Sequence, residues 1–253
     1  MKSIHDTRLL FHRYTVQMLR NPVWLFVGFS VPVLYLVLFT PLLKELPGTK
    51  GFPTGSVLDL FLPGILALMA FASGSSAGFN TIFDLQSGLI ERFRVTPASR
   101  FAILIGPILS GLVMMTVFDG VVVAVGYGFG FAVHWLGLLV LVVLLWLLAA
   151  MMAAFSTATA LVTKDISSFA AIINGINLPI LLLAGVLLPI SLGPLWLRTL
   201  AHLNPLYYLV AASRVLAAGH IAQPAVWQAF AILVPLCTLV LVWATRVFRR
   251  AVA

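Results

Sequence analysis

Residues 136–161 read LGLLVLVVLLWLLAAMMAAFSTATAL, a run without a single ionisable side chain. A helix of about 20 residues crosses a hydrocarbon core of roughly 30 Å, so this run is long enough to span a bilayer. Backbone groups that face lipid must pair within their own segment, and the run is too long and too uniformly apolar for a barrel strand. The run therefore predicts a membrane-spanning helix.

Composition and five further apolar runs extend this prediction to the whole chain. Of its 253 residues, 62% are hydrophobic and 9% are charged, and the mean hydropathy is +1.12. These values are typical of a chain whose solvent is lipid. The other runs are 24–43, 58–83, 102–125, 169–190 and 225–245. We expect an all-α membrane protein that forms one domain over residues 1–253, with six spans.

The positions of the cations predict the orientation, because Lys and Arg favour the cytoplasmic loops. With both termini in the cytoplasm, the inner segments hold eleven cations and the outer segments hold four. The inner ones are Lys2, Arg8, Arg13, Arg20, Arg92, Arg94, Arg100, Lys164, Arg246, Arg249 and Arg250, and the outer ones are Lys44, Lys50, Arg198 and Arg214. The net charge of +8 is therefore explained by topology and does not indicate nucleic-acid binding. We expect a multi-pass protein of the cytoplasmic (inner) cell membrane.

Residues 1–21 show a helical stripe. Ile4, Thr7, Phe11, Tyr14 and Met18 recur at spacings of three and four, and polar residues occupy the other face. This pattern predicts an amphipathic helix on the inner membrane surface, and a solvated helical tail is the alternative.

A second unusual segment, 191–224, separates the last two runs. It reads SLGPLWLRTLAHLNPLYYLVAASRVLAAGHIAQP, and Asn204-Pro205 divides it into two pieces that are each too short to cross. We expect two half-helices that re-enter from the outside and cap the bundle, since irregular backbone at membrane depth must be covered. Two helices lying flat on the outer surface are the alternative.

Signals for catalysis or metal binding are weak. GSSAG at 74–78 matches the nucleophile pattern G-x-S-x-G, but the predicted topology separates Ser76 from the outer residues His134, His202 and His220. These small residues are better explained as a close approach of two helices. The single cysteine, Cys237, offers no thiol pair. We expect no catalytic residue, no metal site and no cofactor bound by this chain.

Asp119 is the ionisable residue placed deepest in a predicted span. A carboxylate inside a membrane is costly and is a functional candidate by default. Its surroundings could be a wet cavity or a hydrogen bond to a neighbouring helix, and no second intramembrane charge offers a proton relay.

The loop 84–101, DLQSGLIERFRVTPASRF, combines charges with an apolar face. A short helix over about 86–95, stopped by Pro97, would place Leu89, Ile90 and Phe93 on one face and Glu91 and Arg94 on another. Such a helix favours docking of a cytoplasmic partner. The alternative is that Arg92, Arg94 and Arg100 are only topology signals.

Three stretches resemble the permeases of ABC-2 type ABC transporters. They are Gly88 to Arg100, the stretch GILALMAFASGSSAGF at 64–79, and HLNPLYYLVAASRVLAAG at 202–219. The wording LIERFRVTPASR is most similar to the daunorubicin-resistance subset of drug exporters. The resemblance covers essentially the whole chain.

The resemblance implies roles for these residues. Contact with an ABC ATPase subunit would involve Leu89, Ile90, Glu91, Arg92, Phe93, Arg94, Pro97 and Arg100, and the outer gate would involve Asn204, Pro205, Tyr207, Tyr208 and Arg214. ATP and Mg²⁺ would bind the separate ATPase subunit, since this sequence has no G-x-x-x-x-G-K-[ST] motif. Two permease copies, identical or sister chains, would enclose one pathway.

The resemblance also implies export of a hydrophobic or amphiphilic compound, such as a drug or a lipid-like molecule. A lipid-linked glycan or polysaccharide is the alternative cargo. A proton-coupled secondary carrier is the alternative class, and it would depend on Asp119.

Overall fold

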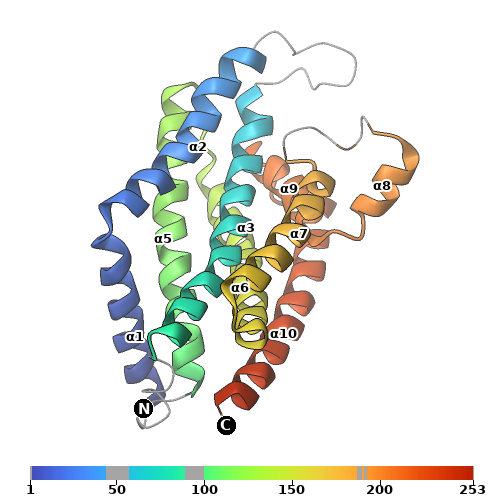
Figure 1. Cartoon of the computed structure of the whole chain (residues 1–253). Helices are drawn as coiled ribbons and strands as arrows, with labels where there is room; N and C mark the ends of the chain where they lie inside the picture. The colour runs from blue at the N-terminus through green and yellow to red at the C-terminus, as the bar shows by residue number, and fades with distance from the viewer. Residues whose placement is uncertain (1, 44–56, 89–99, 187–189, 191–192, 253) are drawn as a thin grey trace.

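The computed structural model describes residues 2–43, 57–88, 100–186, 190 and 193–252, and the described elements are all helices (Figure 1). In chain order they are α1 (Lys2–Leu19), α2 (Pro22–Leu43), α3 (Val57–Gln86), α5 (Arg100–Gly128), α6 (Trp135–Thr163), α7 (Ile166–Ala184), α8 (Leu195–Ala201), α9 (Pro205–Ala217) and α10 (Pro224–Val252). The predicted all-α class is confirmed for this part of the chain.

The long helices run back and forth between two ends of one bundle (Figure 1). Both termini lie at the same end, called here the terminal end, and α8 lies toward the opposite, far end. By length and composition, five helices can cross a membrane: α3, α5, α6, α7 and α10. The described apolar part of α2, Leu25–Leu38, is shorter.

Helix α7 ends earlier than the apolar run predicts. The run extends to residue 190, but the helix stops at Ala184 because Gly185 adopts a left-handed conformation with φ of 68°. A glycine in this conformation is a common helix terminator, since it lacks the Cβ that penalises positive φ. Apolar composition therefore overestimated this helix.

Helices α3 and α6 form the centre of the bundle, and they approach closely at the small residues of 74–78. A Cβ on Gly74 would lie 2.6 Å from the carbonyl oxygen of Ala149, so only glycine fits there. The Ser156 hydroxyl accepts a hydrogen bond from the Gly78 backbone N–H (2.9 Å) and donates one to the Ser75 carbonyl (2.6 Å). The predicted close approach of two helices at GSSAG is confirmed.

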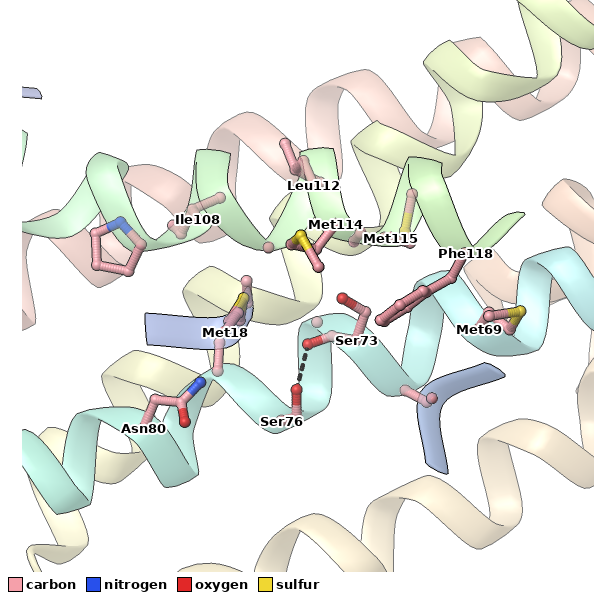
Figure 2. A pocket seen from close by; sticks show the side chains of 18 of the residues that line it. Met18, Met69, Ser73, Ser76, Asn80, Ile108, Leu112, Met114, Met115 and Phe118 are labelled. Atoms are coloured by element: carbon pink, nitrogen blue, oxygen red, sulfur yellow. Dashed lines mark hydrogen bonds between the residues drawn. The ribbon is translucent and has the colours of Figure 1, made fainter. Parts of the chain in front are cut away.

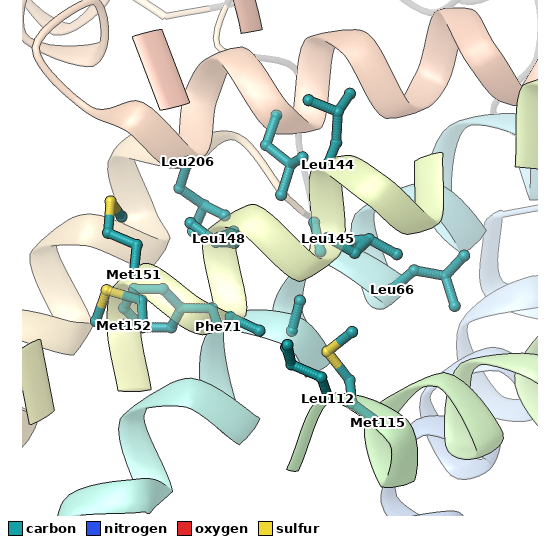
Figure 3. Packing of buried hydrophobic residues seen from close by; sticks show 14 of the residues in the cluster. Leu66, Phe71, Leu112, Met115, Leu144, Leu145, Leu148, Met151, Met152 and Leu206 are labelled. Carbon is teal, nitrogen blue, oxygen red and sulfur yellow. The ribbon is translucent and has the colours of Figure 1, made fainter. Parts of the chain in front are cut away.

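Leucines of α6 fill the space among several helices (Figure 3). Leu144, Leu145 and Leu148 are each at most 1% exposed. Figure 3 shows them near Phe71 of α3 and Leu206 of α9. Burial on one side and exposure to lipid on the other, where Leu139 is 65% exposed, together explain why this run is almost continuously apolar.

Helix α1 packs along the first part of α5, as Figure 1 shows. Leu10 and Tyr14 are its buried core residues, and Leu10 packs where Gly106 leaves room on α5. The Thr15 and Ser110 hydroxyls add a hydrogen bond of 2.9 Å between the two helices. The expected stripe therefore needs one change: Leu10 is buried, whereas Phe11 is half-buried.

Candidate functional site

At the far end, Asn204 connects α9 to α7. Its side-chain oxygen accepts a hydrogen bond from the Leu206 backbone N–H (3.0 Å), which caps the start of α9. Its amide nitrogen donates to the Ile180 carbonyl in α7 (2.7 Å). Pro205 fits the first position of α9, where its missing N–H costs nothing. The Asn-Pro pair therefore starts one helix and anchors it to another.

Arg214 joins three segments through backbone carbonyls. Its Nη2 donates to the carbonyls of Gly185 (2.7 Å) and Val186 (3.3 Å), and its Nε donates to that of Leu60 in α3 (3.3 Å). Burial lowers the pKa of Arg214 to about 10, so the guanidinium remains charged at neutral pH. A fixed cation among three carbonyls holds α9, the end of α7 and the start of α3 together.

Three aromatic rings cluster beside this anchor. The ring of Tyr207 lies 5.1 Å from that of His202 and 5.4 Å from that of Tyr208, in edge-to-face geometry. The Tyr208 hydroxyl donates to the His202 carbonyl (3.0 Å). Five residues predicted for the outer gate, namely Asn204, Pro205, Tyr207, Tyr208 and Arg214, thus belong to one assembly.

The predicted division of 191–224 into two pieces is found, but the two helices differ. Most of α9 is packed, with Leu206, Leu209 and Leu216 fully buried. In α8, Leu195 is 80% exposed and Trp196 is 63% exposed. The assembly is therefore built on α9, and α8 contributes little to its packing.

At the terminal end, Leu89, Ile90, Glu91, Arg92, Phe93, Arg94 and Pro97 lie outside the described residues. The structure describes the two helix ends that flank them: α3 ends at Gln86, and α5 begins at Arg100. Between α1 and α3, the Tyr14 hydroxyl donates to the Asp84 carboxylate (2.6 Å). Burial and then the nearby carboxylate raise the pKa of Tyr14, so the phenol keeps its proton as donor.

A cavity of about 380 Å³ lies between α1, α2, α3 and α5, and residues of α6 and α10 also line it (Figure 2). Ser73, Ser76, Asn80 and Asp84 line it from α3, and Met114, Met115 and Phe118 line it from α5. Sequence reasoning missed this cavity. The helical spacing of the four polar residues (three, four and four positions) is a signal that could have located its polar wall.

The structure gives Ser76 no catalytic partner in the described lining. Its hydroxyl donates to the Ser73 carbonyl of its own helix (2.7 Å), and no described lining residue is a histidine. His134 bonds the Ala217 carbonyl (2.9 Å), away from this cavity. Among the described residues there is also no group of three or more His, Cys, Asp or Glu side chains that could hold a metal ion.

Asp119 is 4% exposed on α5. Neither carboxylate oxygen has a hydrogen-bond partner in the described ranges, and the residue does not line the described cavity. The expected hydrogen bond to a neighbouring helix is thus not found among the described residues, and a functional role of Asp119 stays a prediction.

Comparison with known proteins identifies the family of this chain. Residues 5–217 match the family described as "ABC-2 type transporter". The chain is 32% identical over 216 residues to the protein named "Putative transport permease ycf38" of Cyanophora paradoxa, covering 84% of this chain and 74% of that one. Proteins of the same name from Pyropia yezoensis and Porphyra purpurea are 27% and 26% identical over 220 and 215 residues. The helical bundle and this match together show that the chain belongs to the ABC-2 type transporter family, and it is an integral, multi-pass membrane protein of the transport-permease kind.

Proposed function

We propose that the chain is the permease subunit of an ATP-driven exporter for a hydrophobic or amphiphilic compound. Family membership carries this proposal, because an ABC transporter couples a permease to an ABC ATPase. In the proposed arrangement α2 also crosses the membrane, which brings the number of spans to six. Its 22 residues would extend about 33 Å at 1.5 Å per residue. The chain itself has no catalytic role. ATP and Mg²⁺ would bind the partner ATPase, which would act from the terminal end in the cytoplasm.

The contacts at the terminal end support mechanical coupling there. Residues 89–99 connect α3 to α5, and α1 is attached to both of these helices by side-chain hydrogen bonds, from Tyr14 to Asp84 and between Thr15 and Ser110. A force applied to the connection would therefore reach three helices directly. ATP can drive the change only if it binds one arrangement of the complex better than the other.

The exposed face of α7 supports a second permease copy. Asn174, Gly175, Leu178 and Leu182 share this face and are all exposed. Pro179 has no N–H to donate to the Gly175 carbonyl. An amide side chain and a free carbonyl at mid-span are unfavourable against lipid and are satisfied at helix contacts. We infer that α7 of a second copy covers this face.

The far-end assembly around Arg214 supports a gate role. It joins α9 to the end of α7 and to the start of α3, so a change in these contacts would alter the far end of all three helices together. In the proposed exporter the compound leaves past this assembly.

The ATPase partner is tested by co-purification. A candidate ABC ATPase subunit is co-expressed with the tagged permease, and bound ATPase is quantified after detergent extraction. We expect Glu91→Ala with Arg94→Ala to abolish both retention and ATP-driven export while membrane insertion is unchanged. Lys164→Ala, which removes a cation at another predicted inner turn, is the matched control. Retention equal to that of the wild type would contradict coupling through residues 89–97.

The second copy is tested by cysteine cross-linking in membranes. In a Cys237→Ala background, Leu178→Cys on the α7 face should form a disulfide-linked dimer on oxidation. Leu239→Cys on α10, which is equally exposed at 64%, should not. Equal dimer yields at the two positions would contradict the proposed interface.

The carrier alternative is tested at Asp119. If ATP is the driver, Asp119→Asn leaves export largely intact, because the exporter needs no titrating group in the span. A flux that follows an imposed proton gradient and is lost in the variant would favour the carrier.

A further inference from the structure

We propose that the cavity between α1, α2, α3 and α5 is a binding site for a single-chain amphiphile with a cationic amine head. The head would lie at the terminal end beside Asp84, and the chain would lie along the methionines and Phe118 of α5 (Figure 2). This inference rests on the proposed export function only for the claim that the bound ligand is then exported. Binding itself needs no ATPase.

The shape of the cavity favours an extended ligand. Its lining on α3 runs from Ile65 to Asp84, which is roughly 28 Å along a helix at 1.5 Å per residue. Its volume of about 380 Å³ lies within the ~300–1,000 Å³ typical of small-molecule sites. A long and narrow space within one subunit suits a single flexible chain.

Polarity changes along the length of this space. On α3, the lining is apolar from Ile65 to Ala72, and its polar residues, which begin at Ser73, continue to Asp84. The α5 wall facing them, from Ile103 to Phe118, carries no polar side chain in the lining. Tyr14 of α1 adds a hydroxyl at the polar end, and the lining also includes the hydroxyls of Tyr35 in α2 and Thr157 in α6. A ligand that matches both halves has a polar head at the terminal end and an apolar chain beyond it.

The apolar half can adapt to chains of different shape. Figure 2 shows Met114 and Met115 on the α5 side and Met69 on α3, with Phe118 close to them. Methionine side chains are flexible and polarizable, and they fill irregular spaces against variable ligands. This part of the cavity therefore favours an apolar chain and tolerates chains of different shape.

The polar half selects the charge of the head. Asp84 is the one carboxylate in the described lining, and that lining contains no Lys, Arg or His. The carboxylate accepts from Tyr14 but has capacity for further donors. Arg13 stacks on the Tyr14 ring at 5.7 Å and interacts electrostatically with Asp84, but it is exposed and does not line the cavity, so it compensates this carboxylate from outside. The Asn80 amide, exposed next to this site, has no hydrogen-bond partner in the described part of the chain. An amine head, which donates to both groups and complements the charge, fits best.

The test uses the full-length permease alone, in lipid nanodiscs, with a long-chain alkylamine that carries a photoreactive diazirine near the end of its chain. After irradiation, adducts are mapped by peptide mass spectrometry. We expect adducts on the segment Gly111 to Phe118 and on α3 near Met69. An alkyl sulfate of the same length should compete at least about tenfold less well than the unlabelled amine.

A matched pair of glycines on α5 tests the location. Gly111 lines the cavity, and Gly120 does not. A Cβ added at either one meets no atom within 4 Å, so both tolerate a side chain. Gly111→Leu should fill the cavity and reduce labelling by at least about tenfold, whereas Gly120→Leu should leave it unchanged.

Asp84→Asn tests the head. The asparagine oxygen can still accept from Tyr14, so the contact between α1 and α3 is kept while the charge is removed. We expect the preference for amine over an alcohol of the same chain length to disappear. Melting of the purified variants establishes that each one is folded.

Three results would overturn the proposal: equal labelling of the Gly111→Leu and Gly120→Leu variants, adducts spread evenly over exposed α7 and α10, or equal competition by amine, alcohol and sulfate. The last two would indicate bulk lipid contact only. If the amine does not bind but the ATPase is retained normally, the exporter proposal still holds. If the amine binds but the ATPase is not retained, the proposed site still holds.

Discussion

Helices α6 and α7 follow one another in the chain and are both apolar enough to cross a membrane, yet the bundle treats them differently. In the most apolar window of α6 half of the residues are buried, against 11% in that of α7. Helix α6 contains no proline, whereas α7 contains Pro179 and two asparagines. Helix α6 is held along its sides by α3, α9 and α10, with Ser156 as a buried polar contact.

Helix α7 is attached to the bundle along one face only. Phe169 and Ile173 are buried on this face, and Asn177 accepts a hydrogen bond from the Ser75 hydroxyl of α3 (3.4 Å). Asn204 bonds the Ile180 carbonyl near the last turn, and Arg214 bonds the Gly185 carbonyl just beyond it. Hydropathy therefore identifies both helices but does not separate a central one from a peripheral one. A helix attached along one face leaves the opposite face for another surface, which is why the exposed Asn174 matters.

The largest effect is expected where the two helices meet α3 together. Gly78→Leu would clash with the Phe169 ring of α7 and with Ser156 of α6, and should destabilise the solubilised subunit by about 3 kcal/mol or more. Gly120→Leu on α5 is the control, because a Cβ there meets no atom within 4 Å. Its effect on subunit unfolding should stay within about 0.5 kcal/mol. Chemical or thermal unfolding in detergent measures the stability of both variants. Similar losses of unfolding free energy in the two would contradict the central position of the α3 contact.

The next effect is expected at the far-end tether of α7. Arg214→Leu leaves the carbonyls of Gly185, Val186 and Leu60 without this donor, which should cost about 2 to 3 kcal/mol. Arg214→Lys keeps the charge but not the fork of donors, and should recover only part of this loss. Hydrogen exchange should show faster opening at the end of α7, with α6 protected as before. Equal opening of both helices would show that the tether is not specific to α7.

A smaller effect is expected from one hydroxyl on α6. Ser156→Ala removes the bonds to the Gly78 N–H and the Ser75 carbonyl and should cost about 1 to 2 kcal/mol. Thr159→Ala, which removes a hydroxyl bonded within α6 itself, to Phe155, should cost much less. Thermal unfolding compares the two, and equal shifts of the melting temperature would argue against a special contact at Ser156.

The smallest effect is expected at the start of α7. Hydrogen bonds from the Ser167 hydroxyl and then the Ser168 N–H hold the pKa of Asp165 at about 2, below the usual 3.8. This stabilisation is complete above pH 3.8 and is lost as the pH falls through about 2. The melting temperature of the wild type should therefore exceed that of Asp165→Asn at neutral pH, and the gap should narrow toward pH 2. A gap independent of pH would exclude the charged cap as its cause.

Much of the fold could be predicted from local patterns. Uninterrupted apolar runs indicated the spanning helices, Asn204-Pro205 indicated the break between α8 and α9, and GSSAG indicated a close helix approach. The end of α7 was misplaced because the stop depends on the backbone conformation of Gly185. The stripe of α1 also includes Leu10, which the spacing pattern left out, because burial depends on how α5 lies against α1.

The candidate sites, too, were predictable in part and unpredictable in part. The residues expected at the outer gate do lie together, but the carbonyls that hold Arg214 come from α3 and from beyond α7, and no spacing rule links them. The Tyr14–Asp84 bond joins residues 70 positions apart, and the cavity lining extends from Tyr14 to Phe248. No local pattern contains a pairing over that distance.

The sequence by itself determined that this chain is helical and embedded in lipid, because a backbone in hydrocarbon must satisfy its hydrogen bonds within each apolar segment. Only the tertiary structure decided which helix lies at the centre, which face is left for a partner and where an amphiphile could fit. Those properties depend on side-chain volume and on polar groups brought together from distant segments. Hydropathy records neither, because it assigns the same value to a leucine whether it faces lipid or another helix.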